Sequence, residues 1–139
     1  MKEFYKSDTA LVYFDESLDT LFLKYYKKVN NDDHFLEINN ALLKAFCSLN
    51  TNKVVADIRQ MNMISVNAQK WIVTVLFPEM LKHLAGKPLI HAQLLNDKDI
   101  MSKVSALNVK NKAKNLVEGF EVFQFSDENE LIDFLKDVK

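Results

Sequence analysis

Three short apolar runs separated by helical patterns constrain the fold of this chain more than any other feature. Residues 53–58, 88–95 and 121–125 have the length and the β-branched or aromatic character of buried strands. Between and after these runs, apolar residues recur at the three- and four-residue spacing of helices. Strands that alternate with helices predict an α/β fold built on a mostly parallel sheet.

The residues before the first helical pattern predict an antiparallel hairpin at one edge of this sheet. Residues 10–14 are apolar and lead into a polar turn. In residues 20–29, successive side chains are expected to point to opposite faces of a strand. Leu21, Leu23 and Tyr25 share one face of this second strand, which should cover the core. The aromatic side chains on the hairpin are candidates for an exposed patch.

The whole chain then has the expected order β-β-α-β-α-β-α-β-α. Glycine and proline number only 2 each, and no linker or repeat interrupts the pattern. Residues 1–139 are therefore expected to form a single domain, which is an ordinary size for one hydrophobic core.

Side chains able to cap a helix stand at the start of each helical pattern. Asn31 precedes the first pattern and Ser65 the second, and both have the short polar side chains that N-cap positions favour. Asn96 or Asp97 should open the third helix and Ser126 the fourth.

The second helix is apolar on nearly every side between Trp71 and Phe77. It should run from Ser65 toward Gly86, with Pro78 kinking it or splitting it after Phe77. Packing in the core is one explanation for this composition. The other is that the excess apolar surface forms a homodimer face or lines a pocket, with Trp71, Val75 and Phe77 as the candidate residues.

Charge and cysteine content narrow the classes of partner. Lys and Arg total 18 against 19 Asp and Glu, and Arg59 is the only arginine, so specific nucleic-acid binding is not expected. No apolar run approaches the roughly 18 residues of a membrane span, so we expect no membrane insertion. Cys47 is the only cysteine, and the first residues lack a signal segment, so a cytoplasmic location is expected.

Asp57 and Arg59 form the most specific pair of candidate site residues. They end the central strand, and residues i and i+2 of a strand face the same side. A structural ion pair and a partner or ligand site both explain the pair. Three further candidates share the following loop and helix start, where capping is the alternative explanation: Asn62, Ser65 and Asn67.

Reactive and metal-binding motifs are missing from the sequence. His34, His83 and His91 stand at no metal-ligand spacing, and no nucleophile or phosphate-binding motif occurs. We therefore expect no catalytic residue, no metal site and no cofactor.

The order of elements and several residues resemble the SpoIIAA-like proteins, which share the fold of the STAS domain of sulphate transporters and anti-sigma-factor antagonists. The resemblance covers about residues 10 to 138. It is carried by Val12-Tyr13-Phe14-Asp15, Val55-Ala56-Asp57-Ile58-Arg59, Trp71, Pro78 and Phe120-Glu121-Val122 to Phe125-Ser126.

This chain departs from the phosphorylation element of the anti-sigma-factor antagonists. Those proteins carry Asp-Ser-Ser-Gly at the start of the second helix, where this chain reads Ser65-Val66-Asn67-Ala68. Asn67 falls at the position of the phosphorylated serine and has no hydroxyl, and Ser65 is the nearest one. The resemblance thus implies a non-catalytic module, interacting with a protein partner or regulating one, whose partner is unknown. The alternative expectation is a carrier or sensor of an apolar or lipid-like small molecule.

Overall fold

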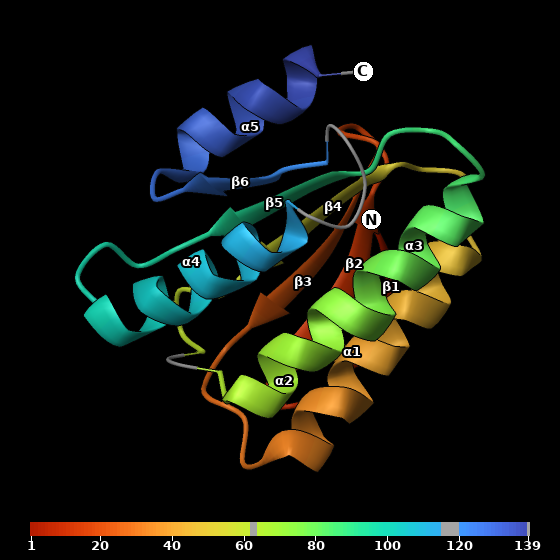
Figure 1. Cartoon of the computed structure of the whole chain (residues 1–139). Helices are drawn as coiled ribbons and strands as arrows, with labels where there is room; N and C mark the ends of the chain where they lie inside the picture. The colour runs from red at the N-terminus through yellow and green to blue at the C-terminus, as the bar shows by residue number, and fades with distance from the viewer. Residues whose placement is uncertain (62–63, 115–119, 139) are drawn as a thin grey trace.

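The computed structural model describes residues 1–61, 64–114 and 120–138 (Figure 1). Its centre is a six-stranded mixed sheet with the strand order β1-β2-β3-β4-β5-β6. The first three strands are antiparallel, whereas β3, β4, β5 and β6 are parallel to one another. The bounds of the strands are β1 Lys2–Lys6, β2 Ala10–Asp15, β3 Thr20–Tyr25, β4 Lys53–Asp57, β5 Ile90–Leu94 and β6 Val122–Phe125.

Helices cover the two faces of the sheet unequally (Figure 1). In the described part of the chain, one face carries five helical elements and a large hydrophobic core, and the other carries α5 over a smaller core. The bounds are α1 Asp32–Cys47, α2 Val66–Trp71, the π-helical segment η1 Ile72–Leu76, α3 Phe77–Leu84, α4 Ile100–Ala113 and α5 Glu128–Asp137. The predicted α/β class with parallel strands at its centre is confirmed.

The predicted edge hairpin is in fact a three-stranded antiparallel edge. β1 lies outside β2, and its register shifts between Glu3 and Tyr5. The sequence concealed this strand because its Lys and Glu residues are those of an exposed edge, which charged side chains and bulges protect from further pairing. The observed order therefore begins with three strands before the first helix.

The alternation along β3 places its side chains as predicted. Leu21, Leu23 and Tyr25 are buried in the larger core, and Phe22 lies on the opposite face in the smaller one. Phe123 of β6 also packs on the α5 side, while its neighbour Val122 is in the larger core.

The predicted caps hold for the first two helices and not for the other two. The side chains of Asn31 and Ser65 accept hydrogen bonds from backbone N–H groups in the first turns of α1 and α2. α4 begins at Ile100 because the preceding residues form a turn, in which the Asn96 carboxamide accepts from the N–H of Lys98. Asp127 caps α5.

Pro78 changes the second helix in a different way from the predicted split after Phe77. Proline has no N–H, and its ring clashes with the carbonyl four residues earlier. The π-helical segment η1 stands just before it, and the Phe77 N–H donates to the Ile72 carbonyl five residues back. This wider turn accommodates the ring, so the chain stays helical to Leu84. Ala85 ends it in the left-handed conformation, with φ of 51°.

The apolar segment of this helix is mostly core. Phe77 is 1% exposed, and Trp71 is half-buried against the same core. Val75 is 36% exposed whereas Phe77 is buried, so the three candidates do not form one exposed face. The prediction of excess apolar surface on this helix was too high, because α1 and α4 cover the helix in addition to the sheet.

Candidate functional site

Asp57 and Arg59 meet just past the carboxyl end of β4. Arg59 Nε donates to Asp57 Oδ1 at 2.9 Å, and an Arg59 terminal nitrogen donates to Asp57 Oδ2 at 2.7 Å. This is the two-bond geometry that matches a guanidinium to a carboxylate. The Asp57 side chain is only 10% exposed, so its charge depends on this partner.

Glu128 is the third member of this ion-pair group, and no pattern in the sequence predicted it. The same terminal nitrogen of Arg59 donates to Glu128 Oε1 at 3.0 Å, which joins the loop after β4 to the first turn of α5. The hydrogen bond to Asp57 is the main cause that raises the pKa of Arg59. Two carboxylates thus neutralise the guanidinium, so a free anion-binding role for Arg59 is disfavoured.

A hollow of about 160 Å³ lies beside this group on the α5 side of the sheet. We call it the carboxyl-end hollow, because it lies where β4 and β5 end. Its lining residues are Tyr13, Asp15, Leu18, Phe22, Lys24, Val55, Asp57, Leu94, Glu128, Leu131 and Ile132.

Tyr13 and Asp15 contribute polar groups to the carboxyl-end hollow. Burial, followed by the charges of Asp15 and Asp57, raises the pKa of Tyr13 to about 12, so its phenol stays protonated at neutral pH. Asp15 Oδ1 accepts hydrogen bonds from the backbone N–H and the hydroxyl of Ser17. The lining contains no histidine or cysteine. The arrangement suits polar contacts with a partner, and it offers no nucleophile with an adjacent base.

The other predicted loop residues lie on the opposite face of the sheet. Ser65 Oγ accepts from the Ala68 N–H at 3.0 Å and donates to Asp32 Oδ1 at 2.6 Å, which ties the starts of α2 and α1 together. Asn67 is exposed on α2. Asn62 lies outside the described residues. Closeness in sequence to Arg59 therefore does not place Ser65 and Asn67 in the carboxyl-end hollow.

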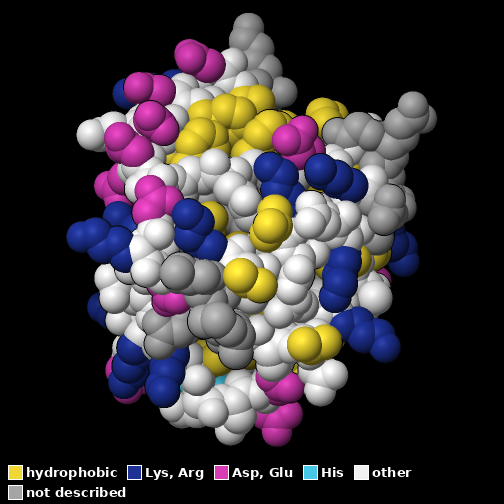
Figure 2. Space-filling view, turned by 60° about the vertical axis from the view of Figure 1, so that its left-hand side comes forward, with side chains coloured by type: hydrophobic (Ala, Val, Ile, Leu, Met, Phe, Trp, Pro, Cys, Tyr) yellow, Lys and Arg dark blue, Asp and Glu magenta, His cyan; other side chains and the backbone are white. Residues whose placement is uncertain are grey.

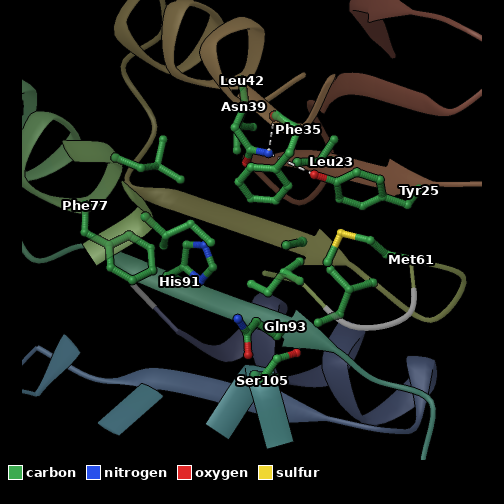
Figure 3. Close-up of a pocket in the computed structure, with 16 residues that line it drawn as sticks. Leu23, Tyr25, Phe35, Asn39, Leu42, Met61, Phe77, His91, Gln93 and Ser105 are labelled. Atoms are coloured by element: carbon green, nitrogen blue, oxygen red, sulfur yellow. Dashed lines mark hydrogen bonds between the residues drawn. The ribbon is translucent and has the colours of Figure 1, made fainter. Parts of the chain in front are cut away.

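A small cavity inside the larger core is a feature that the sequence analysis did not anticipate (Figure 3). Its volume is about 30 Å³, which holds one or two water molecules. Most of the wall is apolar, but five lining residues carry polar groups: Tyr25, Asn39, His91, Gln93 and Ser105. His91 and Gln93 are two residues apart in the buried strand β5 and therefore face the same side. These polar residues in a buried strand were the sequence feature that could have predicted the polar groups of the cavity.

His91 is the group in this cavity with an unmet bonding capacity. Its Nδ1 atom is buried and has no hydrogen-bond partner, whereas the Tyr25 hydroxyl accepts from Asn39 Nδ2 at 2.9 Å. Burial lowers the pKa of His91 to about 4, so the ring is neutral at physiological pH. Phe77 packs edge-on against it, with ring centroids 4.8 Å apart.

Replacing Arg59 with alanine should cost roughly 1–3 kcal/mol of unfolding free energy, because Asp57 would keep a mostly buried and unpaired charge. Glu128→Gln should cost less than about 0.5 kcal/mol, since the Glu128 side chain is 58% exposed. Urea denaturation measures both. If the pair is structural, Asp57→Asn in the same chain should recover part of the Arg59→Ala loss. Additive losses would show that the two side chains are not coupled.

Within the described ranges, no cluster of three or more His, Cys, Asp or Glu residues is arranged to hold a metal ion. Nor does any helix of that part of the chain have the length and apolar character needed to cross a membrane.

Comparisons with known proteins give no family for this chain. No family model matches it, no curated protein matches its sequence, and no solved structure matches its fold.

Proposed function

We propose that this chain is a non-catalytic protein-interaction or regulatory module of SpoIIAA-like type that acts in the cytoplasm. The observation that carries the proposal is the partial cover of one sheet face. α5 packs on β5 and β6 and covers Phe22 of β3 in the smaller core, whereas Tyr13, Lys24 and Tyr26 on the same face stay half-buried or exposed. A sheet face of this kind is a natural place for a partner to bind.

The side chains of the uncovered region suit a protein partner. We define the open sheet face as Tyr13, Lys24 and Tyr26, which are half-buried or exposed. The Tyr13 and Phe22 rings stack with centroids 5.1 Å apart and planes within 6°. Lys24 Nζ lies 5.9 Å from the centre of the Tyr26 ring, and Tyr26 is 44% exposed. Tyrosine side chains are enriched at protein interfaces and among the residues that contribute most to binding.

The occupant that fits best is an amphipathic helix of a partner protein. A helix on the open sheet face would lie beside α5 and complete the layer that α5 begins. Its apolar stripe would cover Tyr13 and Tyr26, and an acidic side chain on it would meet Lys24. The carboxyl-end hollow, with Asp57 held by Arg59, borders the same region and would receive the end of this helix.

The alternative function is a small-molecule carrier or sensor, and the cavity in Figure 3 is the observation that favours it. The unpartnered Nδ1 of His91 can bind one polar group of a guest. The present volume of about 30 Å³ is too small for a lipid-like ligand, so the core would have to widen. Native mass spectrometry separates the two ideas, since a carrier purified from several hosts should retain a bound mass.

A binding experiment with a captured partner tests the leading proposal. The photo-cross-linking residue benzoylphenylalanine in place of Tyr26 would join this chain covalently to its partner in cells that make both proteins. The partner, once identified, would be purified for affinity measurements. Lys24→Glu should weaken its binding by about tenfold or more. The matched control Lys87→Glu changes an exposed lysine in the turn after α3 and should leave the affinity unchanged. Equal affinities for the wild type and Lys24→Glu would contradict the proposal.

A further inference from the structure

The β6 edge of the sheet is flanked by two helix stripes of opposite charge. On α4, Lys103 and Leu107 line a hollow together with Gln124 of β6, so this face of the helix borders the edge strand. Lys110 continues the same stripe, and its Nζ lies 4.0 Å from Glu121, just before β6. The spacing of these three residues, i, i+4 and i+7, keeps them on one side of the helix. Leu107 is 49% exposed between its two lysines.

A stripe of the same spacing lies on α5, across the edge strand. Phe134 packs on Phe123 and Phe125 of β6, with ring centroids 4.8 and 5.1 Å apart. Glu130 and Asp137, four residues before and three after Phe134, are exposed on the same side of α5. Figure 2 shows a hydrophobic patch at the level of α5 and β6 that is bordered by Asp and Glu side chains.

The two stripes run in the same direction and stand at matching levels along the strands. Glu128 of α5 binds Arg59 beyond the carboxyl end of β4, and the Leu135 carbonyl accepts from Lys53 Nζ at the start of that strand. α5 therefore runs antiparallel to β4, and α4 does so too because it connects the parallel strands β5 and β6. Lys103 lies near the carboxyl ends of the strands, and Lys110 lies near the start of β6.

We propose that the occupant of this edge is a second copy of the same chain, related by a two-fold axis that runs along β6. Such an axis preserves direction and level but exchanges the two faces of the sheet. α4 of each protomer would then lie beside α5 of the other. Lys103 would face Glu130 of the partner subunit, Leu107 would face Phe134, and Lys110 would face Asp137. Each contact would occur twice.

Charge complementarity selects this axis over the other simple arrangement. A two-fold axis perpendicular to the sheet would pair the β6 edges antiparallel, but it would place α4 beside α4 and α5 beside α5, with like charges opposed. The existing partners of the lysines do not compete strongly. Lys103 is 3.4 Å from Asp97 and Lys110 is 4.0 Å from Glu121, and both acids are more than half exposed. This inference does not depend on the open sheet face.

A charge-exchange experiment tests the dimer. The α4 variant carries Lys103→Glu and Lys110→Glu, and the α5 variant carries Glu130→Lys and Asp137→Lys. In sedimentation equilibrium at low salt, the wild type should dimerise, and 0.5 M salt should weaken the dimer by about tenfold or more. Each variant alone should be monomeric, because its two stripes would then have the same charge. An equimolar mixture should restore a dimer with one copy of each.

A double variant at exposed lysines away from the β6 edge controls for the change in net charge. Lys70→Glu with Lys87→Glu makes the same change of net charge as the α4 variant, at exposed sites away from this edge. It should leave dimerisation unchanged. Thermal melts followed by circular dichroism show that each variant is folded. A wild type that stays monomeric to about 1 mM, a dimer that survives in either variant, or a folded mixture without the heterodimer would overturn the proposal.

Discussion

Phe77→Ala should lower the free energy of unfolding by about 3–5 kcal/mol, the largest effect that we expect from a single side chain. Phe77 is 1% exposed, and its ring packs edge-on against Phe120 as well as His91. Truncation removes these contacts and leaves a space that joins the cavity already present in the larger core. Urea or guanidinium denaturation measures the loss.

Val75→Ala is the matched control for Phe77→Ala, because it shortens an apolar side chain two residues away that is 36% exposed. It should cost less than about 1 kcal/mol. A benzene-sized molecule should raise the melting temperature of Phe77→Ala and not that of the wild type, since an apolar cavity of this origin binds such guests. If Phe77→Ala lowered the free energy of unfolding only slightly and Val75→Ala lowered it strongly, the buried face of this helix would have been assigned wrongly.

Acid should destabilise the protein through His91, which is the second large effect. Burial lowers its pKa to about 4, from an ordinary value near 6.5 in the unfolded chain. Below pH 6.5 the unfolded chain therefore binds a proton that the folded protein does not. Stability is highest above pH 6.5 and falls as the pH drops toward 4, where this one group costs about 3 kcal/mol.

The contribution of His91 is isolated by a difference between variants. Carboxylates also titrate near pH 4, so the pH dependence of the wild type alone does not identify the histidine. His91→Asn should flatten the stability profile between pH 6.5 and 4, even though it lowers stability at pH 7. His34→Asn is the control, because His34 is only half-buried, at the start of α1. Parallel profiles for the wild type and His91→Asn would show that the buried ring is not the group that titrates.

The parts of the fold that follow local rules were predictable from the sequence. Alternating strands and helices gave the α/β class, and Asn31 and Ser65 cap the helices that they precede. The sequence also predicted the pairing of Asp57 with Arg59, although β4 ends at Asp57 and Arg59 lies in the turn that follows, where its backbone N–H also donates to Asp57 Oδ1. Each of these features depends on residues that are close together in the chain.

The features that were missed depend on contacts between distant segments. β1 is an edge strand whose charged residues hide its alternation, and it forms because β2 offers a partner. Glu128 joins Arg59 only because α5 folds back over the sheet. Ser65 and Arg59 are six positions apart, yet the sheet separates them. Such a separation depends on which way the chain turns after β4, and a local pattern does not specify that.

The location of the bound partner tests the central claim most directly. Three variants would carry benzoylphenylalanine at Tyr26 on the open sheet face, at Val66 on α2, or at Lys87 after α3, all of which are exposed. The account predicts that the same partner protein is cross-linked at Tyr26 and at neither of the other positions. Cross-linking at Val66 or Lys87 with none at Tyr26 would contradict it.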